Sequence, residues 1–419
     1  MIVNYKRENS IISTSKLYCC LAVDALYFKP DIKVGPNGVQ GFLEDIHVGQ
    51  KEFSLYSHDI DFFISFVREN WSKVIRSGFV FQINPLFVQF KPFVIHIIQS
   101  SHGKASKSII DMLYEIKNIL HNHRIEIVAF SFDGDNAYSN MNQLFYDSFI
   151  NRMLKKNFIP IGRAISIRIS PDFLHIIKRL RYRLLSCIIH MGFNINSQII
   201  NIHQIQKVLK NMPPIVYCNA PLTKMHDSLP LKLFSLNNFL TLFEKKLFHE
   251  SAFWFPITLC IVAMSNKNIG YQNREFLLET AIWFLAYYKK CYDNFLIEHE
   301  GEILRERKYQ NEKDVLPYTT QILIEFTNNI YTNISLTTKY DNVDVDRVST
   351  GPLEHTFGRA RIKCKNFHTI NKFIQSIGEL NEQALRHTSE EINDVKRRSL
   401  NFGVTFEDKG EEELLFAST

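Results

Sequence analysis

Apolar and polar positions in the first half of the chain alternate between strand-like and helix-like patterns. Strand formers fill runs at 16–28, 39–49, 90–99, 125–132 and 164–170. Apolar residues spaced three and four apart fill helical segments at 107–124, 142–154 and 172–191. The turn-rich sequence KPDIKVGPNG separates the first two strands. The order β-β-β-α-β-α-β-α predicts an α/β fold, in which a three-stranded meander continues into a mixed sheet flanked by helices.

The stretch from 190 to 345 has a different character, because helical patterns dominate it and strand patterns are few. Its helical patterns lie at 237–248, 274–297 and 319–334, and Pro213, Pro214 and Pro230 mark an irregular stretch near its start. We therefore expect a large all-helical insertion domain that interrupts the sheet. The expected parts are the first part of the core at 1–189, the helical insertion at 190–345, the final core helices at 346–388 and a charged tail at 389–419.

Composition sets limits on the class of protein. A chain of 419 residues with 45% apolar content can bury a large core. The formal net charge of +6 permits a polyanionic partner without requiring one. The seven cysteines form no CxxC pair and are odd in number, which argues against a disulfide framework or a zinc module and favours a reducing intracellular compartment. The longest apolar run, from Phe253 to Met264, is short for a bilayer span, so no membrane partner is expected.

Three acidic residues stand where chemistry is commonly found. Asp24 lies inside the apolar strand LAVDALYF, where a carboxylate is costly unless it is paired or binds a metal. Asp133 follows the strand IEIVAFSF, although an Asp-Gly turn also explains it and Asp135 competes for the same role. Glu354 lies just inside a helix that Pro352 helps to start, a place that the helix dipole alone favours for an acid. Together the three read as a dispersed carboxylate triad for divalent metal ions and phosphodiester chemistry.

A second acid and a histidine lie at the start of another helix. Asp172 and His175 are three positions apart, so both face one side of the first helical turn and could hydrogen-bond near the end of the preceding strand. For Asp172 alone, an N-cap aspartate beside a packed histidine is the simpler interpretation.

Basic residues cluster in two places that could contact nucleic-acid phosphates. One group lies in the helix that follows Asp172 and the other follows Glu354; the candidates are Lys178, Arg179 and Arg181, and Arg359, Arg361 and Lys363. A solvated helix face explains the first group almost as well. The second group puts positive charge beside a carboxylate, as a nuclease needs where a DNA backbone meets a metal.

Four motifs in this order resemble the DDE transposases with an RNase H-like fold, in particular the P-element-like group and more distantly the hAT group. VDALYFKPDIKV with GVQGFLEDI is similar to the first catalytic strand of that family, and FDGDNAYSNMNQLF is similar to its second motif. PDFLHIIKRLRYRLL resembles its [C/D]xxH element, with Phe173 and Leu174 in place of the usual prolines. GPLEHTFGRAR resembles its glutamate motif, preceded by a long helical stretch like the insertion these enzymes carry.

The resemblance implies a function and a set of site residues. Asp24, Asp133 and Glu354 would be the catalytic metal ligands for two Mg²⁺ or Mn²⁺ ions, and Asp172 and His175 would shape the site. The chain would cleave DNA and transfer strands, with transposon ends or target DNA as its partner. Assembly into a homo-oligomer and residence in the nucleus are implied in the same way.

Two other functions stay open at the level of sequence. Such transposases usually begin with a zinc-dependent DNA-binding domain, whereas here no cluster of cysteine and histidine precedes the first core strand. A domesticated or degenerate transposase that binds DNA or protein without catalysis is therefore the alternative to an active enzyme, and the intact triad argues against it. An unrelated RNase H-like nuclease is a third possibility.

Overall fold

The structure is a computed structural model, and it describes part of the chain. The described residues are 16–35, 38–43, 60–87, 90–101, 107–132, 143, 168–186, 189–190, 199–200, 202–220, 226–266, 269–298, 320–339, 343–363 and 369–385. These residues belong to two compact units. Unit 1 comprises 1–173 and 331–387, and unit 2 comprises 174–330 with 388–419. The expected helix at 142–154, apart from residue 143, and the charged tail lie outside the described residues.

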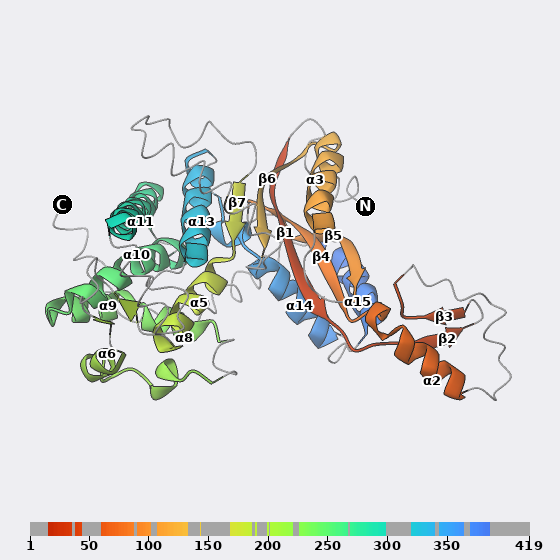
Figure 1. Ribbon diagram of the computed structural model, residues 1–419. Helices are drawn as coiled ribbons and strands as arrows, with labels where there is room; N and C mark the ends of the chain where they lie inside the picture. Colours follow the sequence, from red (N-terminus) through yellow and green to blue (C-terminus); the bar gives the residue numbers. More distant parts are fainter. Residues whose placement is uncertain are drawn as a thin grey trace. The chain divides into compact units, whose positions relative to one another are not determined.

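A five-stranded mixed sheet forms the centre of unit 1 (Figure 1). The strand order is β5-β4-β1-β6-β7. The strands are β1 (Leu17–Tyr27), β4 (Ser77–Pro85), β5 (Phe93–Ser100), β6 (Ile125–Phe132) and β7 (Arg168–Pro171). β1, β4 and β5 pair antiparallel as a meander, and β6 and β7 extend it parallel to β1. The predicted α/β class, with a mixed sheet flanked by helices, is confirmed.

The second strand of the meander was wrongly predicted. Within the expected strand at 39–49, only the start belongs to a described strand, β3 (Gly38–Gln40), which pairs with β2 (Lys33–Gly35) in a separate hairpin. The true second strand is β4, which pairs with β1. All nine residues of β4 are buried, but Gln82 and Asn84 interrupt its apolar run, so it lacks the continuous apolar pattern of a strand covered on both faces.

Helices cover both faces of the sheet. α14 (Gly351–Lys363) and α15 (Ile370–Leu385) pack on the face that contains Ala22 and Leu26, where Phe357 and Phe373 complete a buried apolar cluster. The other face carries Phe130, whose ring meets Tyr114 of α3 (Lys107–Asn122) edge to face at 5.7 Å. Because Phe130 pairs with Leu21, its side chain points away from the Ala22 face. The helix predicted at 107–124 is confirmed with a small change at its end, and α14 and α15 are helices within the stretch predicted at 346–388.

One charged group at the start of β6 makes the stability of unit 1 depend on pH. Glu126 accepts hydrogen bonds from Lys16 at 3.0 Å and from His121 at 3.2 Å. Burial by itself raises the pKa of Glu126, but these two partners outweigh it and hold the pKa below its ordinary value of 4.5. A carboxyl group whose pKa is lowered by folding adds stability above its unfolded pKa and loses it as the pH falls through the folded pKa.

We therefore expect Glu126→Gln to lower the urea midpoint at neutral pH. The change should be small, because water screens the interaction of Glu126 with its exposed partners. The difference from wild type should shrink as the pH falls below 4.5. Urea titrations across this pH range measure it, with Glu115→Gln on the exposed side of α3 as the matched control. A difference that grows on acidification would contradict the sign.

Unit 2 is mainly helical in its described part. Its helices are most of α5 (Phe173–Ser186), α6 (Ile202–Val208), α8 (Ser228–Leu233), α9 (Leu236–Glu244), α10 (Phe248–Ser265), α11 (Tyr271–Glu298) and the first half of α13 (Thr320–Lys339). The short strands β8 (Ile189–His190) and β9 (Ile199–Ile200) pair antiparallel. The helix predicted at 237–248 ends early, at Glu244 of α9, because the chain turns at Lys246 with a positive φ of 60° before α10 begins at Phe248.

The core of unit 2 is built on α10. Trp254 is fully buried, donates its indole N–H to the carbonyl of Leu233 at 3.0 Å and contacts the rings of Phe234 and Phe253. By length and composition, α10 is long and apolar enough to cross a membrane, which differs from the sequence expectation; 56% of it is buried inside the protein. Core helices commonly combine these properties.

The division between the units falls inside two helices, whereas the sequence led us to expect boundaries near 190 and 345. α5 belongs to unit 2 after its first residue, since Arg179 pairs there with Glu325. The second half of α13 belongs to unit 1, where Thr332 donates to the carbonyl of Ile169 at 2.8 Å. Each of these polar contacts lies within one unit and joins segments that are far apart in the chain, so periodicity does not reveal them.

Candidate metal centre at the ends of the parallel strands

Three neighbouring strands reach the same level of the sheet directly before an aspartate. Val23 of β1 pairs with Phe132 of β6, and Phe132 pairs with Pro171 of β7. The next residues in the three segments are Asp24, Asp133 and Asp172. Asp133 and its competitor Asp135 lie outside the described residues. The carboxyl ends of neighbouring parallel strands are the usual ligand-binding edge of such sheets.

Asp24 faces the helix that carries the glutamate motif. Side chains alternate along a strand, so Asp24 points to the same face as Ala22 and Leu26, and both of these pack in the cluster with α14. The carboxylate is half-buried, and its Oδ1 accepts the main-chain N–H of Ala25 at 2.7 Å. The strand thus presents a carboxylate toward α14.

Glu354 lies in the first turn of α14. The main-chain N–H of Glu354 donates to the carbonyl of Thr350 at 3.0 Å, so this threonine is the N-cap residue of the helix. Leu353 and Phe357 are buried in the apolar cluster, which fixes the rotation of the helix and leaves Glu354 half-buried. A carboxylate in the first turn is stabilised by the helix dipole.

Asp172 is a buried carboxylate that connects the sheet to α14. Only 2% of this residue is exposed, and its main-chain N–H donates to the carbonyl of Phe132 at 3.2 Å. The hydroxyl of Thr350 donates to its Oδ2. Sequence reasoning did not single out Thr350; a threonine directly before the Gly-Pro at the start of a helix is the signal that could have found it.

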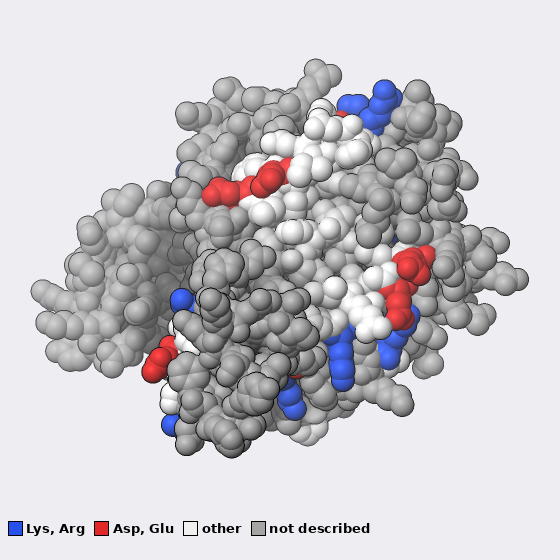
Figure 2. All heavy atoms as spheres, turned by 90° about the vertical axis from the view of Figure 1, so that its right-hand side faces the viewer, with Lys and Arg blue, Asp and Glu red and all other residues white. Residues whose placement is uncertain are grey.

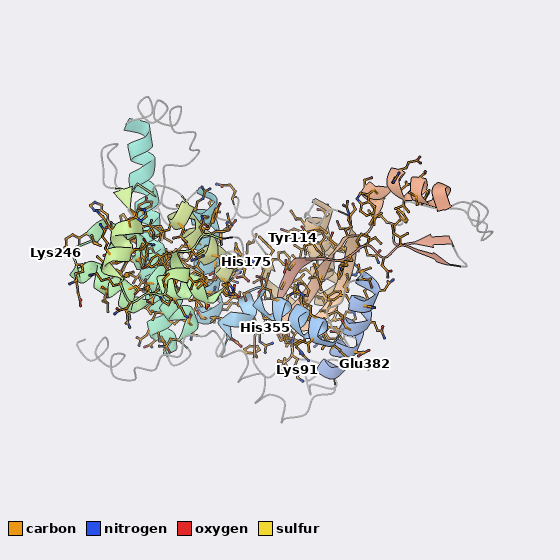
Figure 3. The ribbon with its side chains drawn as sticks, turned by 90° about the horizontal axis from the view of Figure 1, so that it is seen from below. Lys91, Tyr114, His175, Lys246, His355 and Glu382 are labelled. Carbon is orange, nitrogen blue, oxygen red and sulfur yellow. The ribbon has the colours of Figure 1, made fainter. Side chains whose placement is uncertain are left out.

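Asp172, His175 and Glu354 form a compact group of possible metal ligands. One ligand atom of each lies within 4.8 Å of those of the other two. His175 follows Asp172 by one helical turn of α5, and His355, next to Glu354, is on the exposed side of α14 (Figure 3). Oxygens around one small divalent ion lie at most about 4 Å apart, so this spacing needs little adjustment to fit an ion. Two carboxylates and an imidazole suit Mn²⁺ and related divalent ions.

Among the described residues, Asp24 is not a member of this compact group. The structure therefore brings Glu354 together with the two residues that the sequence assigned to shaping the site. Asp24 reaches the same face of the sheet from β1, and Glu354 is the residue common to the sequence-predicted triad and the compact group.

Buried polar side chains on β4 hold the start of α14 against the sheet. Gln82 and Asn84 are fully buried, and the Nε2 of Gln82 donates to the Oδ1 of Asn84 at 2.8 Å. Gln82 also accepts from the hydroxyl of Thr356 at 2.8 Å, and Asn84 donates to the carbonyl of Ser349 at 3.2 Å. Because Ser349 and Thr356 flank Glu354 in sequence, these bonds fix the glutamate relative to the strand ends.

The three basic candidates on α5, Lys178, Arg179 and Arg181, are engaged within unit 2. Lys178 pairs with Asp227 at 2.9 Å, and Arg179 pairs with the buried Glu325. Arg181 is 2% exposed and donates to the carbonyls of Val216 at 3.0 Å and Cys218 at 2.7 Å. Burial lowers the pKa of Arg181 from its ordinary value. Arg181 therefore stabilises the helical unit, and we do not propose it as a DNA contact.

The basic residues of α14 have a different setting. Arg359, Arg361 and Lys363 are exposed, and Lys363 pairs with Glu379 of α15 at 2.5 Å. They follow Glu354 along one helix, so the carboxylate and the positive charge belong to the same rigid element. Seen from the side of α2 (Ile60–Glu69) and α15, the described surface carries lysine and arginine side chains along its lower edge (Figure 2).

The fold of this chain is similar to that of a known protein. The mixed five-stranded sheet flanked by helices is consistent with an RNase H-like fold. A solved structure with a similar fold is the Drosophila P element transposase strand transfer complex, with a TM-score of 0.54 and 12% sequence identity, covering 92% of this chain and 85% of that one. No family model and no curated protein matches the sequence. At this identity the similarity is one of fold.

Proposed function

We propose that the chain is a transposase-like enzyme that uses divalent metal ions to cleave DNA and transfer strands. The observation that carries this proposal is the lateral pairing of Val23, Phe132 and Pro171, each of which an aspartate follows in the sequence, on a sheet whose Ala22 face is packed by the helix of Glu354. The fold similarity to a transposase strand transfer complex supports it.

In this proposal Asp24, Asp133 and Glu354 hold the metal ions, as the family resemblance implies. Bound divalent ions would supply Lewis acidity and a nucleophilic water or hydroxyl at neutral pH. Asp172 and His175 lie close enough to Glu354 to share a cation with it or to orient it. Thr350 holds Asp172 in place, so that the charge of Asp172 stays directed at the start of α14.

DNA is the proposed substrate. Assembly as a homo-oligomer, residence in the nucleus and a helical unit inserted into an RNase H-like core are parts of the same proposal. The test is a plasmid assay with the wild-type chain, in Mn²⁺ and in excess chelator. We expect nicking and strand transfer that require the metal. Folded protein that binds DNA but gives equal background in both conditions would instead favour a non-catalytic DNA-binding protein.

The exposed cations of α14 should supply much of the affinity for duplex DNA. Replacing both Arg359 and Arg361 with glutamate should weaken binding and lower the slope of log affinity against log salt by about 2, since each lost phosphate contact removes about one unit. Fluorescence anisotropy at several salt concentrations measures this. Lys207→Glu with Lys210→Glu, at exposed positions in and after α6, is the matched control. An unchanged salt slope for the α14 variant would exclude this helix from the DNA interface.

A further inference from the structure

The corner between α9 and α10 presents aromatic rings and lysines together on the surface of unit 2. α9 ends at Glu244 and α10 begins at Phe248. Phe243 is 53% exposed and Phe248 is 55% exposed, and their ring centroids lie 5.7 Å apart in an edge-to-face arrangement. Lys245 and Lys246, both exposed, separate the two rings in sequence. Large aromatic side chains that are exposed side by side commonly mark a binding surface.

The backbone of this corner is held by a defined helix-ending motif. The N–H of Lys246 donates to the carbonyl of Phe243 at 2.9 Å, and the N–H of Leu247 donates to the carbonyl of Leu242 at 3.0 Å. Lys246 has a φ of 60°, a conformation that glycine adopts at no steric cost and that this motif usually gives to glycine. The motif that ends the helix would be satisfied best by glycine at this position. We therefore attribute the lysine to a role for its positive charge.

The inner side of the corner is packed, so the exposed rings stand on a rigid base. Phe239 stacks against Phe243 at 6.2 Å and contacts Phe255 at 5.8 Å, and Phe255 meets Phe284 at 5.5 Å. The buried Asn238 donates to two main-chain carbonyls at the end of α8, at 2.9 and 3.0 Å. Figure 3 places Lys246 at the outer edge of this helical unit.

We infer that this corner is a binding platform for single-stranded nucleic acid. Unpaired bases stack on exposed aromatic rings and phosphates pair with neighbouring cations, which is the recurring chemistry of single-strand binding. Phe248 and Phe243 supply the rings, and Lys245 and Lys246 supply the charge. A duplex keeps its bases stacked on each other and cannot use the rings in this way. The inference goes beyond the proposed catalysis and does not depend on a metal ion.

A protein partner would account for the aromatic rings less completely. Phenylalanine is enriched in protein interfaces, but lysine is depleted there, and two lysines adjoin the rings here. Glu244 is the exposed acid of the same turn, and Glu250, in the first turn of α10, is buried. The local balance of exposed charge therefore favours a polyanion.

The experiment measures anisotropy of a fluorescein-labelled oligothymidylate of about 16 nucleotides, with the full chain in excess chelator. Phe248→Ala should weaken binding about tenfold or more, as loss of one stacked base does elsewhere. Lys246→Gly should weaken binding and lower the salt slope by about 0.7, the value for one phosphate of a single strand. Its thermal midpoint should equal or exceed that of wild type, because glycine suits the positive φ, so misfolding cannot explain the loss.

Phe276→Ala is the matched control, because this ring is 68% exposed on α11 in the same unit. It should bind the oligonucleotide as wild type does. Wild-type affinity in both Phe248→Ala and Lys246→Gly would overturn the inference, as would a wild-type chain that does not bind the oligonucleotide. Loss of self-association in Phe248→Ala with unchanged oligonucleotide binding would assign the corner to a second copy of the chain and would also overturn it.

Discussion

Replacing Glu354 with glutamine is expected to lower metal-dependent DNA cleavage by at least about 100-fold while leaving the protein folded. Loss of groups that only orient metal ligands already costs about 10- to 100-fold, so loss of a ligand charge should cost at least as much. Glu354 belongs to both possible ligand sets, the predicted triad and the compact group with Asp172 and His175. Its replacement therefore tests the centre whichever set holds the metal.

The fold should survive Glu354→Gln because neighbouring residues hold the start of α14. The helix is fixed by Thr350, by Thr356 and by the buried Leu353, and glutamine preserves the shape of the side chain. Circular dichroism and plasmid nicking in Mn²⁺ give the two readouts. His355→Ala, at an exposed position on the same helix, is the matched control and should retain activity. Cleavage at the wild-type rate by Glu354→Gln would show that the helix plays no part in catalysis.

The second large effect concerns the core of unit 2. Trp254→Ala should lower the free energy of unfolding by about 3–5 kcal/mol, since it removes a fully buried ring and leaves a cavity. It also removes the donor to the carbonyl of Leu233 and the ring contacts with Phe234 and Phe253. Urea unfolding followed by circular dichroism measures the change.

Tyr287→Ala is the control for that experiment, because this ring is 64% exposed on α11 of the same unit. Its cost should stay below about 1 kcal/mol. Equal effects of the two substitutions would mean that α10 does not form the core of this unit. A small effect of Trp254→Ala would carry the same meaning.

Apolar patterns in the sequence were enough to predict much of unit 1. The helices α3 and α15 space their apolar residues by helical turns, as burial of one face requires. The strands β1 and β6 are largely apolar runs, which are typical of strands covered on both faces. β4 is equally buried, but Gln82 and Asn84 interrupt its apolar run and read as surface residues, although they bond to α14 and its approach.

The candidate site was predictable only in part because its contacts join distant segments. The sequence singled out Asp24, Asp172, His175 and Glu354 as separate motifs. The hydrogen bond from Thr350 to Asp172 spans 178 residues, and no local pattern encodes it. The sequence also misplaced Arg181. It lies in a basic helical stretch, which predicts an exposed side chain, but its guanidinium donates to the carbonyls of Val216 and Cys218.

Glu354 and the strand-end aspartates are proposed to form one metal centre. Anomalous diffraction from crystals of the chain soaked in MnCl₂ should show a manganese peak within bonding distance of Glu354 and of at least one of Asp24, Asp133 and Asp172. Ordered crystals with no manganese at Glu354, or with manganese bound only elsewhere on the chain, would contradict it.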